Sequence, residues 1–242
     1  LQPRSGECLI YGESTQNLSP ETKRRLGYLI EGHIQYSFMN IYQIEKFYSG
    51  FYKNWNRDAY FDLMKRMKIL PSQKVSSMSC GQRAQVALGL ILAQDPDLLI
   101  LDDFSLGLDP GYRRLFVDHM REYAKAGNKT VFLTSHIIQD MERLIDDVLI
   151  MDYNRVLMRG SASEFMEKFH QFTFDLDRDD LDFKSDPLIV GADRIKNHYE
   201  IYTYASDNEV KAMLETKGLV YRNFVSVKMT LEDAFIGLTG KY

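Results

Sequence analysis

Apolar residues recur along the chain with two different spacings, and these spacings predict alternating strands and helices. Short continuous apolar runs have the length of strands, and they lie at residues 7–11 (ECLIY), 26–30 (LGYLI), 98–101 (LLIL), 130–134 (TVFLT) and 148–151 (VLIM). Between residues 37 and 93 the apolar positions recur at three- and four-residue steps, which predicts helices, and Asn56 is a good cap for the second of them. Further helices are predicted at residues 113–126, 137–144 and 162–169.

Strands that are buried on both faces and alternate with helices favour a parallel α/β sheet. We therefore expect an α/β core formed by residues 1–36 and 94–170, with a helical subdomain at residues 37–93 inserted into it. An acidic segment interrupts the pattern at Asp175, Asp177, Asp179, Asp180 and Asp182, and we place a domain boundary near Gln171. Beyond it, strand-like runs at 200–204 and 226–229 and helix-like runs at 208–217 and 231–238 predict a small α+β domain at residues 171–242.

Composition narrows the classes of function. With 242 residues, 45% of them hydrophobic, the chain can bury a substantial core. The apolar stretch at residues 86–93 is far shorter than the ~20 residues of a membrane-spanning helix, so we expect any membrane role to come through a partner. The net charge of −4 disfavours nucleic acid as a partner. Cys8 and Cys80 show neither metal-ligand spacing nor a disulfide framework, which fits a reducing cytosol.

The polar stretch Ser79-Cys80-Gly81-Gln82 directly precedes a helical run at residues 83–93. The first amide groups of a helix lack intrahelical partners, and the helix dipole places positive charge there, so this stretch could bind an anion. An ordinary helix N-cap explains the same residues. The four residues alone do not distinguish these two interpretations.

Two adjacent carboxylates, Asp102 and Asp103, end the apolar run LLIL, and they are predicted to lie at the carboxyl edge of the parallel sheet, where such folds bind ligands. Strand alternation points the two side chains in different directions. One could hold Mg²⁺ and the other could orient a nucleophilic water, although a solvated strand end is an equally good explanation. Downstream, Asp109 lies in a turn, and His136 follows the strand at residues 130–134.

Taken in this order, the motifs resemble those of the ATP-binding cassette (ABC) ATPases. The segment MSCGQ at 78–82 is similar to the family's signature, LLILDD at 98–103 to its Walker B strand, SLGLD at 105–109 to its D-loop, and His136 to its switch histidine. LGYLIE at 26–31 stands in the place of the Q-loop, and residues 230–242 resemble the tail of exporter-type ATPase subunits.

This resemblance implies ATP and Mg²⁺ as cofactors, and it implies roles for individual residues. Asp102 and Glu31 would contact Mg²⁺, Asp103 stands in the place of the catalytic carboxylate, and His136 faces the γ-phosphate. The family also implies that the signature residues contact ATP held by a second ABC subunit; these residues are Ser79, Cys80, Gly81 and Gln82. Glu31 and Asp109 are the other nucleotide contacts that the family implies. The family also implies an integral membrane permease as partner and a peripheral position at the inner face of the cell membrane.

Four departures from the family bear on catalysis. No G-x-x-x-x-G-K-[ST] motif occurs in the chain, and we expect it ahead of Leu1, in a longer amino terminus. Glu31 replaces Gln, Asp103 replaces the longer Glu, and Cys80 replaces a Gly. Because a positioning error of ~1 Å can cost ~10²-fold in rate, the shorter Asp103 predicts slow hydrolysis.

Three functions remain after these observations. The first is the ATPase subunit of an exporter, which drives a separate permease through ATP-dependent dimer closure. The second is a slow or inactive nucleotide-gated regulatory module. The third, an ABC protein of translation or chromosome maintenance, would predict a second cassette or a long coiled coil, and the sequence has neither. We expect the permease to dock on the helical subdomain near Tyr36, Phe38 and Met39, although packing in the core explains any one of these residues at least as well.

Overall fold

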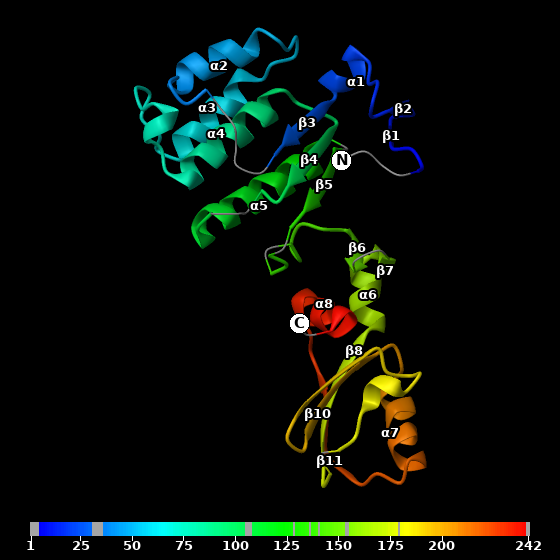
Figure 1. The fold of residues 1–242 in the computed structure, drawn as a ribbon. Helices are drawn as coiled ribbons and strands as arrows, with labels where there is room; N and C mark the ends of the chain where they lie inside the picture. The colour runs from blue at the N-terminus through cyan, green and yellow to red at the C-terminus, as the bar shows by residue number, and fades with distance from the viewer. Residues whose placement is uncertain are drawn as a thin grey trace. The chain divides into compact units, whose positions relative to one another are not determined.

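The computed structural model divides into two compact units, Leu1–Asp140 and Met141–Tyr242, which are described separately below (Figure 1). It describes residues 5–30, 36–104, 108–127, 129–135, 137–139, 141–152, 155–178 and 180–240.

A three-stranded parallel sheet forms the centre of the first unit, in the order β3-β4-β5. Its strands are β3 (Leu26–Leu29), β4 (Leu98–Asp102) and β5 (Thr130–Thr134), so the predicted parallel sheet is confirmed. The central strand places Leu99 and Leu101 on a fully buried face. Helix α4 (Cys80–Ala93) lies between β3 and β4 in the chain, and α5 (Pro110–Ala126) lies between β4 and β5. Parallel neighbours need such crossover connections, which are usually helices.

Two short elements precede this sheet. Strands β1 (Leu9–Ile10) and β2 (Glu13–Ser14) form an antiparallel hairpin whose turn residues, Tyr11 and Gly12, both have positive φ. Helix α1 (Pro20–Arg24) is capped by Ser19. The strand predicted at residues 7–11 is therefore confirmed for only two of its residues.

The helical region predicted at residues 37–93 is confirmed. It contains α2 (Ile41–Ser49), α3 (Arg57–Arg66), the 3-10 turn Val75–Ser77 and α4, and Asn56 caps α3 as expected by accepting a hydrogen bond from the backbone N–H of Ala59. The apolar residues at three- and four-residue steps form its core. Tyr60, for example, is fully buried and donates its hydroxyl to the Ile41 carbonyl.

The second unit contains a four-stranded antiparallel sheet in the order β11-β8-β10-β9, preceded by a hairpin and a helix. Its elements are β6 (Asp147–Asp152), β7 (Arg155–Ser161), α6 (Ala162–Lys168), β8 (His170–Leu176), the 3-10 turn Phe183–Ser185, β9 (Gly191–Ile195), β10 (His198–Thr203), α7 (Asp207–Thr216), β11 (Tyr221–Val227) and α8 (Leu231–Thr239). Helix α7 packs on one face of this sheet, where Val210 and Leu214 join Phe172, Phe174 and Ile201 in the core.

Helix α8 packs on the opposite face of the sheet. A Cβ atom built on Gly191 would lie 2.1 Å from the Gly237 carbonyl oxygen, and one built on Gly237 would lie 2.1 Å from the ring of Tyr202. Any side chain larger than hydrogen at either glycine would therefore separate the helix from the sheet. The predicted helices at 162–169, 208–217 and 231–238 are all confirmed within one residue at each end.

Three predicted features are wrong. The strand near residues 148–151 does not extend the parallel sheet, because β6 pairs antiparallel with β7. Residue 139 and residues 141–144 lie in turns and residues 137–138 are irregular, so the described part of the helix expected at 137–144 is not helical. The backbone N–H groups of Leu144 and Ile145 both donate to the Met141 carbonyl, which closes a single turn there. The acidic segment does not interrupt the structure at Asp175, which lies inside β8 and accepts a hydrogen bond from Asn223.

Strand β11 also begins earlier than the predicted run at 226–229. A bulge between Arg222 and Val225, with Asn223 at positive φ, breaks the alternation of side chains that would have marked this strand. The predicted domain boundary near Gln171 falls inside the second unit and stays a prediction about domain organisation.

Candidate functional site

The carboxyl end of β4 carries the two adjacent carboxylates. Asp102 is exposed, and its Oδ1 accepts a 2.7 Å hydrogen bond from the hydroxyl of Thr134, the residue paired with it on β5. The same hydroxyl oxygen accepts a 3.1 Å hydrogen bond from the backbone N–H of Asp103. Thr134 therefore ties the ends of the two strands together at the edge where parallel sheets bind ligands.

Asp103 adopts a left-handed backbone conformation, with φ of 42°. Outside glycine this region is uncommon, and Asp and Asn tolerate it better than most residues. The next residue, Phe104, is fully buried, and its ring stacks on that of Phe116 at a centroid distance of 4.3 Å. The chain thus turns sharply at Asp103 and is anchored directly after it by the buried Phe104 ring.

This edge fits part of a Mg²⁺ site. Mg²⁺ prefers oxygen ligands and usually takes only one or two carboxylates from the protein, with water and phosphate oxygens for the rest. Asp102 and Asp103 supply such oxygens. Within the described ranges no group of three or more His, Cys, Asp or Glu side chains could hold a metal ion, so the described protein residues do not form a complete cage.

The signature-like stretch forms a capping box at the start of α4. Ser79 Oγ accepts a 3.2 Å hydrogen bond from the backbone N–H of Gln82, and Gln82 Oε1 accepts a 3.0 Å hydrogen bond from the backbone N–H of Ser79. The N-cap interpretation is therefore confirmed, while an anion-binding role for these residues stays a prediction. Cys80 is half-buried and its thiol is free.

Gly81 has a packing role of its own. A Cβ atom built on it would lie 2.5 Å from Cδ2 of Tyr112, in the first turn of α5. Asp109 caps that same turn, because its Oδ1 accepts from the amides of Gly111 and Tyr112 at 2.9 and 3.1 Å. The fold thus brings the start of α4 and the cap of α5 together through one tyrosine ring.

Two of the predicted site residues, Glu31 and His136, lie outside the described residues, and their roles stay predictions. Two residues in contact with the site were not predicted as parts of it. Thr134 could have been found from the sequence, because equal positions at the ends of neighbouring parallel strands face each other. Tyr112 offered no signal, because an aromatic residue in the first turn of a helix is common.

The helical region also carries an aromatic surface, which we define as Tyr36, Phe38, Phe47 and Phe51. All four side chains are exposed, and the rings of Tyr36 and Phe47 meet edge to face at 4.9 Å, as do those of Phe47 and Phe51 at 5.2 Å. Two of the predicted docking residues, Tyr36 and Phe38, belong to this surface, whereas Met39 is half-buried beside it. Exposed apolar patches of this kind are typical of interaction sites. Among the described residues, no helix combines the length and the apolar character needed to cross a membrane.

Comparisons with known proteins agree with the resemblance of the sequence motifs to those of ABC ATPases. A family model described as "AAA domain, putative AbiEii toxin, Type IV TA system" matches residues 37–139. The Nod factor export ATP-binding protein I of Cupriavidus metallidurans is 27% identical over 99% of this chain and 80% of its own length. The protein of the same name from Ralstonia nicotianae is 30% identical over 73% of this chain, which spans only 57% of that relative.

A third relative, the uncharacterized ABC transporter ATP-binding protein YhcH of Bacillus subtilis, is 22% identical over 98% of this chain and 78% of its own length. Among solved structures, an ATP-binding subunit of an ABC transporter matches with a TM-score of 0.59 and 23% identity, covering 69% of this chain and 71% of that one. This structural likeness shows a shared fold.

Proposed function

Because this chain belongs to the family of ABC transporter ATP-binding proteins, we propose that it binds and hydrolyses ATP to drive a separate membrane permease of the exporter type. The proposal rests above all on the pair of carboxylates at the end of β4, held at the carboxyl edge of a parallel sheet by Thr134. The Nod factor export relatives support the exporter assignment. A peripheral position at the inner face of the cell membrane follows from the same proposal.

In this function the two carboxylates have different tasks. Asp102 would supply one oxygen ligand to Mg²⁺, and the hydrogen bond from Thr134 would fix the orientation of its carboxylate. Asp103 would orient the attacking water and accept its proton. When bound, Mg-ATP would supply the metal and the phosphoryl group that is transferred to water; positioning and charge neutralisation are the protein's main contributions to such reactions.

The signature residues would act across a dimer of cassettes. Ser79 and the backbone amides of Cys80, Gly81 and Gln82 would contact nucleotide that a second subunit holds, because the start of a helix favours negative charge. Asp109, Glu31 and His136 would complete the site in the roles that the family implies. Since Asp102 and Asp103 repel phosphate unless a metal is bound, the two unlike half-sites are better placed on different subunits than on one.

We place the permease contact on the aromatic surface. Its four rings supply a large apolar contact area, and their edge-to-face packing fixes their positions before a partner arrives. An amphipathic segment of the permease would bury these rings. Movement of the helical region during dimer closure would then reach the membrane through them.

One observation favours a second candidate function, a slow, nucleotide-gated regulatory module. Asp103 has a shorter side chain than the Glu usual in the family, and its left-handed backbone fixes where that short side chain starts. In such a module closure would matter more than turnover.

Steady-state ATPase activity distinguishes the two candidates. The assay uses this chain joined to a P-loop segment from a relative, with and without the permease. Turnover that the permease stimulates supports the transporter subunit. Nucleotide binding without turnover supports the regulatory module, and absence of both binding and turnover contradicts each of them.

A further inference from the structure

A pocket of about 630 Å³ lies between α3, the end of α4 and the second half of α5. Its lining includes none of the residues assigned above to the ATP site or to the aromatic surface. Its volume falls within the ~300–1,000 Å³ of typical small-molecule sites. The first unit therefore has a second concave region of ligand size.

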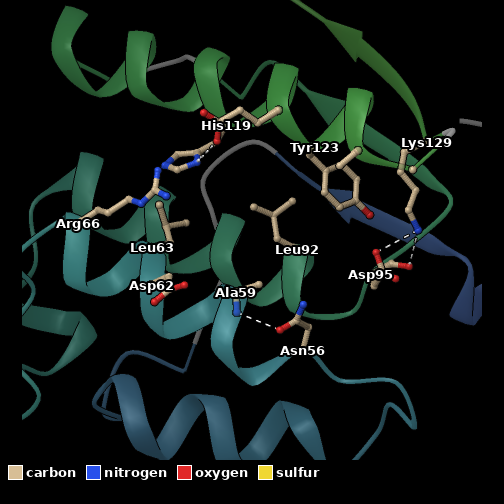
Figure 2. Close-up of a pocket in the computed structure, with 13 residues that line it drawn as sticks. Asn56, Ala59, Asp62, Leu63, Arg66, Leu92, Asp95, His119, Tyr123 and Lys129 are labelled. Carbon is tan, nitrogen blue, oxygen red and sulfur yellow. Dashed lines mark hydrogen bonds and ion pairs between the residues drawn. The ribbon is translucent and has the colours of Figure 1, made fainter.

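Two nitrogen-bearing side chains face each other at one end of the pocket. Figure 2 shows Arg66 of α3 reaching toward the imidazole of His119 of α5. The guanidinium of Arg66 forms no hydrogen bond or ion pair with any residue that the structure describes. The Nε2 atom of His119 is shielded from solvent and also has no hydrogen-bond partner in the described part of the chain. Buried polar atoms are normally hydrogen-bonded, so an unpartnered Nε2 beside an unpaired guanidinium indicates a missing acceptor.

The other charges of the lining limit what this acceptor can be. Lys129, at the far end, already contacts Asp95 at 3.0 Å and Asp97 at 3.5 Å, so Arg66 is the available cation. The pocket lining has three carboxylates, which belong to Asp62, Asp95 and Glu122. It has two permanent cations, which belong to Arg66 and Lys129. A dianion such as phosphate would be repelled by this excess of negative charge, whereas a monoanion that reaches only the Arg66 end would not.

The walls between the two ends are apolar. Leu63 and Leu92 line the pocket from α3 and α4, and Tyr123 of α5 lies across from them (Figure 2). The Tyr123 hydroxyl is already used, since it donates to the Pro96 carbonyl at 2.5 Å, which leaves the ring as an apolar wall. A ligand that fills the pocket therefore needs an apolar, flat body next to its charged group.

We propose that this pocket binds a small organic monocarboxylate, with its carboxylate between Arg66 and His119 Nε2 and its apolar body against Leu63, Leu92 and Tyr123. The guanidinium presents planar donors that match a carboxylate, and Nε2–H supplies one further donor. His119 Nδ1 faces Glu122 Oε2 at 4.0 Å, so Nε2 is the ring nitrogen left for the ligand.

The bound carboxylate would touch α3 and α5 at the same time. It would therefore link the helical subdomain to the helix that follows the Asp102 strand and hold them in one relative position. This makes the pocket a site through which a metabolite of carboxylate type can control the protein. The assignment does not depend on ATP hydrolysis.

Titration of the folded chain with 3-phenylpropanoate tests the proposal. Trp55 is the only tryptophan and directly precedes Asn56 of the pocket lining, so its fluorescence reports on binding, with calorimetry as an independent readout. We expect saturable binding of the carboxylate and no saturation by neutral 3-phenylpropanamide or by inorganic phosphate. Arg66→Gln should weaken binding roughly tenfold or more, because a charge-assisted hydrogen bond is lost. Lys65→Gln removes the same charge from α3 outside the pocket and should bind like the parent.

His119→Phe serves as the second variant, and thermal unfolding of each protein confirms that it is folded. Weaker binding by His119→Phe supports the proposed geometry. Absence of saturation by the parent protein overturns the proposal, as does equal affinity of the parent and Arg66→Gln. Stronger binding of phosphate or of the amide than of the carboxylate would also overturn it, because the pocket would then not select a monoanion.

Discussion

Thr134 Oγ1 donates a 2.7 Å hydrogen bond to Asp102 Oδ1 while it accepts one from the backbone of Asp103. We predict that Thr134→Val lowers the free energy of unfolding by about 1 kcal/mol, because valine keeps the shape and the strand preference but removes both bonds. Urea denaturation measures the change. Thr130→Val, at the other end of β5, is the matched control and should have little effect. An equal decrease in the free energy of unfolding in both variants would show that the two hydrogen bonds of the Thr134 hydroxyl are not the cause.

Asp103→Glu should have opposite effects on activity and on stability. In a chain completed with a P-loop, the longer side chain should raise kcat if Asp103 positions the water. The left-handed backbone at residue 103 should make the same variant less stable, on the order of 1 kcal/mol, because Glu tolerates positive φ less well than Asp.

Asp103→Asn is the companion variant. It should keep the stability, since Asn also tolerates this backbone, but it should abolish turnover because it removes the charge that accepts the proton. Steady-state kinetics and urea denaturation report the two effects separately. If all three proteins turn over at one rate, Asp103 is not the water-positioning group.

Gly81→Ala should destabilise the first unit by about 1–3 kcal/mol, because its Cβ would overlap the Tyr112 ring at the start of α5. Gly50→Ala is the control: its nearest neighbouring atom would lie at an ordinary 3.5 Å. Chemical denaturation of both variants tests the packing account. A Gly81→Ala protein as stable as the parent would show that the two helices separate easily.

How far the sequence predicts the structure depends on whether a feature is local. Capping residues such as Asn56 and Ser79, and continuous apolar runs such as residues 130–134, act within a few positions, and these predictions are confirmed. The helix expected at residues 137–144 is not formed by its described residues, although the Ser135 hydroxyl accepts from the backbone N–H of Ile137 as a helix cap would. The positive φ of Asp103 and the contact between Gly81 and Tyr112 depend on tertiary packing, which no spacing in the sequence reveals.

Burial, together with the charge of Arg66, lowers the pKa of His119 from its ordinary value of 6.5, while Glu122 and Asp118 act in the opposite direction. In the unfolded chain His119 therefore takes up its proton at a higher pH than in the folded one. The neutral His119 therefore contributes to the free energy of unfolding. This contribution is fully present above pH 6.5 and is lost as the pH falls toward the lower pKa of the folded state.

His119→Gln should accordingly weaken the pH dependence of stability just below neutrality. Urea denaturation at a series of pH values compares the variant with the parent. A steeper loss of stability with acidification in His119→Gln than in the parent would contradict the buried, neutral histidine.

In the proposed dimer, Ser79 of one subunit and the Asp102–Asp103 edge of the other form one ATP site. Light scattering tests it most directly, with a P-loop-completed chain carrying Asp103→Asn to prevent hydrolysis. With Mg-ATP this protein should dimerise, and adding Ser79→Arg should block the dimer while leaving ATP binding to the monomer nearly unchanged, because the arginine fills the space of the partner's γ-phosphate. If the double variant dimerises as well as its parent, Ser79 does not act across the interface, and its role is limited to the capping of α4.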